Sequence, residues 1–180
     1  MERKNDEGRV SRRYTLPLVI IIAVLALVAV SRYMRGRVQT ERPYRTLPEI
    51  CALTMTGDSV NCNTILESGK KTAILFFNPE CEACKNEMRE IIKNQKYFLN
   101  VQWLFITIAQ AEDVESFIKD YPVQSIPDSY LFREDYPKSH MLFDVSAPPA
   151  LFVYNEKGKL IVADKGENSI QKIARKLKRH

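Results

Sequence analysis

Two cysteines, Cys81 and Cys84, lie between a predicted buried strand and a predicted helix. Residues 72–78 before them form an almost continuous apolar run, which is typical of a strand buried on both faces of a sheet. After the cysteines, apolar residues recur with the period of a helix to about residue 97. The strand therefore carries two thiols to the beginning of a helix, where the helix dipole favours the reactive thiolate.

The rest of the chain continues the alternation of strands and helices. Two short strands at residues 50–54 and 60–64 are expected to form a hairpin before the cysteine strand. Further strands are predicted at 101–108, 150–155 and 160–164, and further helices at 111–121 and 169–179, whereas 122–146 is irregular apart from a short helix near 138–143. This order predicts an α/β domain with a mixed central sheet and helices on both of its faces.

An apolar run at residues 16–30 marks the N-terminal part of the chain. With Tyr14 and Tyr33 at its ends, it reaches the length of about 20 residues that crosses a bilayer. Pro17 is expected near the start of that helix, where a missing N–H costs little. A cleaved signal peptide and a buried helix are the alternatives. The predicted organisation is a polar tail at 1–13, a transmembrane anchor at 14–33, a stalk at 34–46 and a folded domain at 47–180.

Charge is distributed unevenly along the chain. Residues 1–45 carry ten Lys or Arg against four acidic residues, whereas residues 46–180 carry seventeen against eighteen. The domain is therefore close to neutral, which argues against a nucleic-acid partner. Basic residues are nearly balanced on the two sides of the apolar run, so charge does not orient it. A dithiol is most useful away from the cytosolic thiol pool, and we therefore expect an inner-membrane protein whose domain faces the periplasm or an equivalent compartment.

A zinc site is the alternative use of a cysteine pair. Structural zinc usually takes four ligands arranged in close pairs. The other two cysteines, Cys51 and Cys62, are separated by ten residues, and His140 and His180 have no local partner. The sequence therefore favours redox chemistry at the close pair and predicts no metal site.

Two segments and the order of the elements resemble a known family. Residues 76–85, FFNPECEACK, and residues 147–154, APPALFVY, are similar to the active-site segments of thioredoxin-like proteins. The resemblance extends over residues 47–180 and is closest to membrane-anchored, periplasm-facing thiol-disulfide oxidoreductases of the cytochrome-maturation-reductase type. It implies a thioredoxin-like fold with an added N-terminal hairpin and with an insertion, at residues 122–146, between the second helix and the third core strand.

The resemblance implies a role for each cysteine of the pair. Cys81 is the attacking thiolate and Cys84 is the resolving thiol. Their expected positions agree with these roles, because Cys81 opens the helix beside its free N–H groups, whereas Cys84 lies one turn inside and is shielded. The resemblance also implies disulfide-containing client proteins and a membrane electron donor as partners, and it implies no cofactor.

Two prolines, Pro148 and Pro149, are expected beside the cysteines, where they would contribute to substrate binding. Pro149 matches the cis-proline of the family, and a trans-proline that opens a strand is the alternative. Pro148 stands where the family uses main-chain groups to bind its substrate, and as a proline it has no N–H to donate. Only its carbonyl group is then available to a client polypeptide.

Acidic residues near the cysteines bear on proton transfer. Thioredoxins carry a buried Asp six residues before the first cysteine, and Leu75 occupies that position here. Glu80 and Glu82 are the nearest acids, which either relay a proton through water or are ordinary helix-start acids that interact favourably with the dipole. Their negative charges disfavour a thiolate at Cys81, so this thiolate should be stabilised less than in strongly oxidising relatives. This favours a reductase or an intermediate reduction potential.

Cys51 and Cys62 form a candidate structural disulfide. If Thr56 and Gly57 form a two-residue turn, the two cysteines lie directly opposite each other in the first hairpin, as a cross-strand bridge would require. Such a bridge suits an oxidising compartment. Two free, half-buried thiols are the alternative.

These features together predict a membrane-tethered oxidoreductase whose dithiol reduces disulfides of extracytoplasmic proteins. Oxidation of such proteins is the less favoured direction. The alternative is a redox-inactive, thioredoxin-like binding module on the same tether, for which Pro148 and the missing buried Asp are the motivation.

Overall fold

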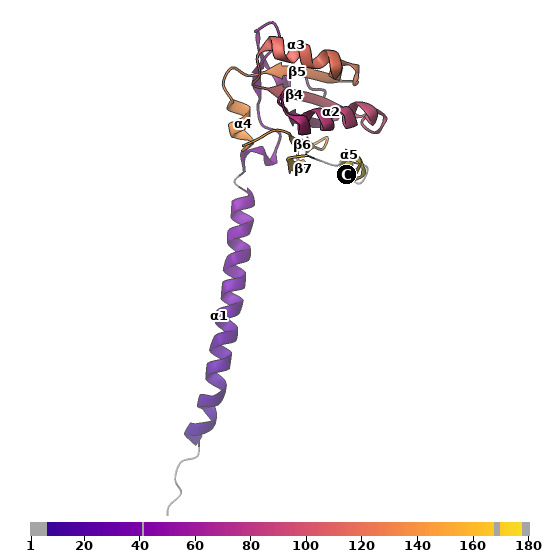
Figure 1. The fold of residues 1–180 in the computed structure, drawn as a ribbon. Coiled ribbons are helices and arrows are strands. Elements are labelled where there is room, and N and C mark those ends of the chain that lie inside the picture. Colours follow the sequence, from indigo (N-terminus) through magenta and orange to yellow (C-terminus); the bar gives the residue numbers. More distant parts are fainter. Residues whose placement is uncertain (1–6, 41, 168–169, 178–180) are drawn as a thin grey trace, which may run out of the picture. The chain divides into compact units, whose positions relative to one another are not determined.

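The computed structural model describes residues 7–40, 42–167 and 170–177, which belong to two compact units, Met1–Arg42 and Pro43–His180. In the first unit, the element described is the helix α1 (Glu7–Thr40) (Figure 1). It contains an 18-residue stretch, Pro17–Met34, with a mean hydropathy of 2.3. This stretch is long and apolar enough to cross a membrane.

Helix α1 is longer than the predicted span. It begins at Glu7, in the predicted tail, and continues to Thr40 through the first part of the predicted stalk. Pro17 accordingly lies within the helix rather than near its start. Arg recurs on both sides of the apolar run and is a good helix former, which favours continuation of the helix beyond that run. Residues 1–6 of the predicted tail lie outside the described residues.

The second unit is built on a seven-stranded sheet with the strand order β2-β1-β5-β4-β3-β6-β7. Its strands are β1 (Cys51–Leu53), β2 (Ser59–Asn61), β3 (Lys71–Phe76), β4 (Val101–Thr107), β5 (Ser129–Arg133), β6 (Ala150–Tyr154) and β7 (Leu160–Lys165). The central strands β3, β4 and β5 are parallel, whereas β6 is antiparallel to β3 and β7, and β1 is antiparallel to β2 and β5. The predicted mixed sheet is confirmed.

Helices cover both faces of this sheet, as predicted (Figure 1). They are α2 (Glu82–Lys93), α3 (Ala111–Asp120), α4 (Lys138–Leu142) and α5 (Ile170–Leu177), with single 3-10 turns at η1 (Pro43–Arg45), η2 (Cys62–Thr64), η3 (Gln95–Tyr97) and η4 (Val123–Ser125). Side chains of α2, α3 and α5 pack with Ala73 and Leu75, and those around η1 and α4 pack with Ile74 and Phe76. Alternate residues of β3 thus face opposite layers, as the pleat of a strand requires. The predicted ends of the last helix, at 169 and 178–179, lie outside the described residues.

The segment 122–146 contains a strand that the sequence analysis missed. This strand, β5, runs parallel to β4. Its side chains are only partly buried except for Phe132, and prolines stand on both sides, at Pro127 and Pro137, so it lacks the apolar run that marks a central strand. Because β4 and β5 are parallel, α3 must cross over one face of the sheet between them, and it lies on the same face as α2.

The first hairpin has a three-residue turn rather than the predicted two-residue turn. The N–H of Thr54 donates to the carbonyl of Asp58 at 2.9 Å, and Gly57 within the turn has a φ of 94°, which favours glycine. The strands therefore pair one residue away from the predicted register.

This shift separates Cys51 from Cys62. Asn61 is the cross-strand partner of Cys51, and the N–H of Cys62 instead donates to the carbonyl of Ile50 at 2.8 Å. A slip of one residue moves a side chain to the other face of a sheet, so Cys51 is exposed and Cys62 is buried. The expectation that the two cysteines face each other is wrong, and both are free thiols in the structure.

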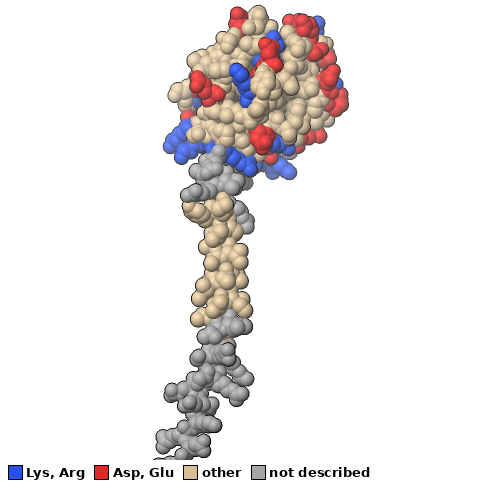
Figure 2. All heavy atoms as spheres, turned by 90° about the vertical axis from the view of Figure 1, so that its left-hand side faces the viewer, with Lys and Arg blue, Asp and Glu red and all other residues tan. Residues whose placement is uncertain are grey.

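The surface of the second unit carries both signs of charge. In Figure 2, Lys and Arg side chains gather along the lower rim of the globular part, and Asp and Glu side chains spread over the rest of the face shown. This mixture fits the nearly equal numbers of acidic and basic residues in 46–180.

Candidate active site

The loop between β3 and α2 presents Cys81 at the N-terminus of the helix. Asn78 shapes this loop, because its carbonyl accepts from the N–H of Cys81 at 3.1 Å and its side chain accepts from the N–H of Glu80 at 2.9 Å. Cys81 is the N-cap residue of α2, with an extended backbone (φ −81°, ψ 116°), and its Sγ accepts from the N–H of Cys84 at 3.4 Å. The first N–H groups of a helix stabilise negative charge placed at such a cap.

Cys84 lies one turn further along α2 and is fully buried. Its Sγ accepts a hydrogen bond from the N–H of Asn78 at 3.5 Å. Burial raises the pKa of the Cys84 thiol to about 12, and the charges of Cys81 and Glu87 act in the same direction. Cys81, by contrast, is partly exposed. Cys81 is thus the more accessible residue of the pair, and Cys84 is a buried thiol that stays protonated near neutral pH.

The two prolines lie beside Cys81. The peptide bond between Pro148 and Pro149 is cis. The carbonyl oxygen of Pro148 lies 3.7 Å from Cys81 Sγ and accepts a weak hydrogen bond from the thiol. Pro149 is buried, and its carbonyl accepts from the N–H of Gly166 at 2.8 Å. This second bond ties the proline turn to the end of β7, so the Pro148 carbonyl has a defined position next to the sulfur.

Glu87 is a functional candidate that the sequence analysis missed. Its side chain is 1% exposed and lies on the face of α2 that also carries Cys84, Met88 and Ile91. Its negative charge contributes to the raised pKa of Cys84. The sequence indicates the burial of Glu87, because these four positions follow the helical period that places side chains on one face, towards the core. An acid on such a face is rare in a protein core, which marks it for attention.

Neither of the acids singled out from the sequence is buried. Glu82 is exposed and pairs with Lys85 at 2.7 Å, and this hydrogen-bonded cation lowers the pKa of the Glu82 carboxyl group. Glu80 is also exposed, and Leu75 is buried in β3 at the position where thioredoxins carry Asp. The position of Glu82 is that of an ordinary helix-start acid, and its charge is partly neutralised before it can oppose a thiolate at Cys81.

The other cysteines and histidines do not join this site. Burial raises the pKa of Cys62 to about 12, and Cys51 adds to the shift. His140 is buried, with Nδ1 at 3.1 Å from Oε2 of Glu134. Among the described residues, no group of three or more His, Cys, Asp or Glu side chains is arranged to hold a metal ion. His180 lies outside those residues.

A family model described as a thioredoxin-like domain matches residues 60–180. The match includes the strand before the cysteines, the cysteine pair, the proline turn and the last hairpin. No curated protein matches the chain.

Solved structures share this fold. A secreted disulfide oxidoreductase of Mycobacterium tuberculosis, homologous to DsbE of E. coli, has a TM-score of 0.60 at 18% identity, over 73% of this chain and 96% of its own. A thiol:disulfide interchange protein of the thioredoxin family from Chlorobium tepidum has a TM-score of 0.60 at 20% identity, over 74% and 94%. StoA from Bacillus subtilis has a TM-score of 0.55 at 17% identity, over 74% and 98%.

Proposed function

Because the chain belongs to the thioredoxin-like family, we propose that it is a thiol-disulfide oxidoreductase that works through Cys81 and Cys84. The observation that carries the proposal is the asymmetry of the pair. Cys81 is partly exposed at the N-terminus of α2, and Cys84 is buried one turn further along the helix. An accessible thiolate and a shielded, protonated thiol suit the two successive attacks of thiol-disulfide exchange.

In the reducing direction, the Cys81 thiolate attacks one sulfur of a client disulfide, and the other client sulfur leaves as a thiolate. A mixed disulfide then joins Cys81 to the client. Cys84 loses its proton and attacks Cys81 Sγ, which releases the second client sulfur. Two electrons have passed to the client, which holds two thiols, and the protein holds a Cys81–Cys84 disulfide. A membrane electron donor would restore the dithiol.

The proton of Cys84 is the obstacle to the second attack, because a pKa of about 12 keeps the thiol protonated near neutral pH. Glu87 lies on the same buried face of α2 and acts electrostatically on this thiol. In this proposal Glu87 accepts the proton as Cys84 attacks. Removal of a proton at the moment of attack by a positioned carboxylate is general-base catalysis.

The proline turn is the proposed docking point of the client. The Pro148 carbonyl faces Cys81 and is able to accept a hydrogen bond from a client N–H, as happens when an extended peptide adds to an edge. Pro148 has no N–H to donate in return. The client would therefore only donate a hydrogen bond to the Pro148 carbonyl, and its disulfide would lie at Cys81.

Helix α1 supports a membrane tether for the domain. We place the tether in the inner membrane and the domain in the periplasm, where protein disulfides persist. The full-length chain should then stay with membranes during an alkaline carbonate wash, and a membrane-impermeant maleimide should label Cys81 in intact spheroplasts. Release by the wash, or labelling that requires lysis, would contradict this placement.

Substitution Cys84→Ser tests the chemistry. The variant should accumulate mixed disulfides with other proteins, seen as high-mass species that a reductant removes, and Cys81→Ser/Cys84→Ser should accumulate none. The wild type should also reduce the disulfides of insulin. If a folded Cys84→Ser captures nothing and the wild type leaves insulin oxidised, a redox-inactive binding module becomes the better description.

A further inference from the structure

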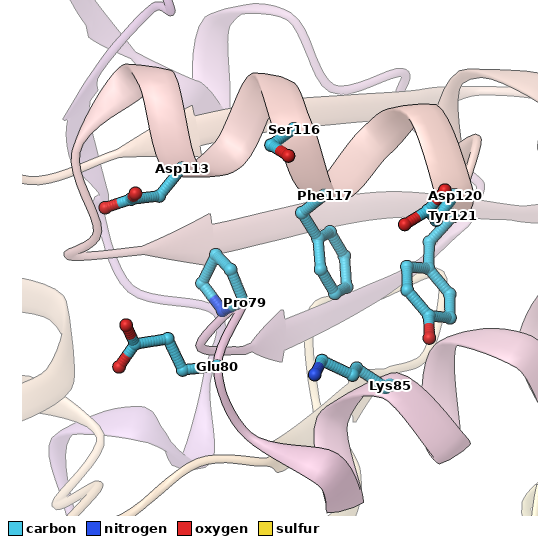
Figure 3. Close-up of a pocket in the computed structure, with 8 residues that line it drawn as sticks. All are labelled: Pro79, Glu80, Lys85, Asp113, Ser116, Phe117, Asp120 and Tyr121. Atoms are coloured by element: carbon cyan, nitrogen blue, oxygen red, sulfur yellow. The ribbon is translucent and has the colours of Figure 1, made fainter.

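A pocket of about 330 Å³ lies beside the active-site loop (Figure 3). It is lined on one side by Pro79 and Glu80 and on the other by Asp113, Phe117, Asp120 and Tyr121, among others. Figure 3 shows the α3 side chains and the loop side chains facing each other across the space. Pro79 and Glu80 directly precede Cys81, so the pocket adjoins the loop that carries the attacking sulfur.

Two aromatic side chains and Pro79 supply the apolar part of the lining. The rings of Phe117 and Tyr121 stack with their centroids 4.6 Å apart, and Phe117 also contacts Phe77 of the core, at 5.3 Å between ring centroids. Arg89 of α2 places its guanidinium carbon 5.8 Å from the centroid of the Tyr121 ring. The ring of Tyr121 thus already receives one cation, as aromatic faces do.

Three carboxylates of the pocket form no ion pair with any other described residue. Lys85 is the only basic residue of the lining, and it is paired with Glu82 at 2.7 Å. Glu80, Asp113 and Asp120 are exposed, and none of them forms an ion pair with any residue in the part of the chain that the structure describes. The pocket therefore combines an aromatic surface with an excess of negative charge.

Building on the proposed function, we propose that this pocket binds a Lys or Arg side chain of the client, close in sequence to the cysteine that Cys81 attacks. The carboxylates lie along the pocket rather than at one point, because Asp113 and Asp120 are seven residues and therefore about 10 Å apart on α3 (Figure 3). The charged head lies in the negative field that they share, and the aliphatic stem lies along Phe117 and Tyr121. Glu80 is adjacent to Cys81, and consecutive Cα atoms are about 3.8 Å apart, so the two client groups are near neighbours in their own chain. The substrate class is then a protein disulfide flanked by a basic residue.

A set of synthetic peptides tests this inference. Each peptide is a disulfide-linked homodimer with one cysteine, and Arg replaces Gln at one of the three positions on either side of it. Reduced, full-length protein in detergent is mixed with each peptide, and the released peptide thiol is measured in a single turnover, with Cys81→Ser as the blank for other thiols. At least one Arg peptide should react about fivefold faster than the Gln parent, in keeping with the strength of exposed ion pairs, and added salt should reduce this ratio.

Two double variants assign the preference to the pocket. Asp113→Asn/Asp120→Asn removes two of the three carboxylates, so it should lower the Arg-to-Gln ratio to below about two. Glu112→Gln/Glu115→Gln removes the same charge from exposed positions of α3 outside the lining, and it should keep the fivefold ratio. No preference in the wild type, an unchanged ratio in the Asp variant, or an equal loss in the Glu variant would overturn the inference. Reduction of the Gln peptide would still support the proposed function, whereas failure to reduce any peptide would reject both.

Discussion

Cys81 Sγ and the carbonyl oxygen of Pro148 lie 3.7 Å apart, although 67 positions separate the two residues in the chain. The contact joins the beginning of α2 to the turn before β6. A client strand that donates a hydrogen bond to this carbonyl would place its disulfide at the attacking sulfur. In the proposed cycle, docking and chemistry are therefore located at one point of the fold.

The four cysteines should differ strongly in their reactivity towards iodoacetamide. Cys51 and Cys81 are at least partly exposed, whereas Cys62 and Cys84 are buried thiols with pKa values raised to about 12. Only the thiolate reacts, and a thiol with such a pKa is ionised to about one part in 10⁴ at pH 8. Peptide mapping by mass spectrometry should find the label on Cys51 and Cys81 in the native, reduced protein, and on all four cysteines after unfolding. Equal labelling of Cys81 and Cys84 would refute the assigned order of attack.

Substitution Glu87→Gln should slow the second attack of the cycle. Without the carboxylate the Cys84 proton must pass to solvent, and the mixed disulfide should persist about 100-fold longer or more. Rapid quenching followed by mass spectrometry measures its lifetime. The lifetime should also depend more steeply on pH in the variant, which a purely structural role would not produce. Glu90→Gln, on the same helix but partly exposed, is the control, and a wild-type lifetime in Glu87→Gln would exclude the proton acceptor.

The reduced protein should lose stability at alkaline pH in part through Cys62. Burial raises the pKa of Cys62 from 9.0 in the unfolded chain to about 12, so the folded state holds the proton more tightly. The resulting stability is fully present below pH 9 and is lost as the pH rises towards 12. At pH 10 this one thiol should account for about 1.4 kcal/mol of the loss. The free energy of unfolding is measured with urea and a reductant at pH 7 and at pH 10. Its decrease between the two pH values should be smaller by that amount in Cys62→Ala than in the wild type, and equal decreases would contradict the prediction.

The hydroxyl of Tyr154 fastens the beginning of the second unit to the sheet. It donates to the carbonyl of Tyr44 at 2.7 Å in a buried environment, across 110 positions of sequence. Tyr154→Phe keeps the ring and removes the bond, so the free energy of unfolding should fall by about 1–2 kcal/mol with an unchanged m-value. Tyr136→Phe, at a residue that is 61% exposed, should change it little. The free energy of unfolding of both variants is measured with a denaturant, and equal losses in the two would argue against the hydrogen bond.

Elements with a strong local pattern were predictable. The apolar run of β3, the period of α2 and the last hairpin were recognised because burial on both faces, helical spacing and a turn each leave a pattern over a few residues. β5 was missed because it is partly buried and has prolines on both sides. Its strand character depends on pairing with β4, which is a long-range contact.

The first hairpin shows how a small local error has a large effect. One more residue in the turn changes the register by one, and the period of two along a strand then moves Cys51 and Cys62 to different faces. A candidate disulfide thereby becomes one exposed and one buried thiol. The same residues are compatible with a two-residue turn and with a three-residue turn, so only the folded backbone shows which of the two forms.

By itself, the sequence determined what is local at the site: two thiols, at the N-terminus and one turn inside a helix, after a buried strand. The tertiary structure decided which distant segments meet there. Pro148 reaches Cys81 because β6 pairs with β3, and the acidic wall of the pocket exists because the crossover from β4 to β5 lays α3 beside α2. Short-range backbone preferences depend on consecutive residues. The order of the strands, and the face of the sheet on which a crossover helix lies, depend instead on the burial of the whole sheet.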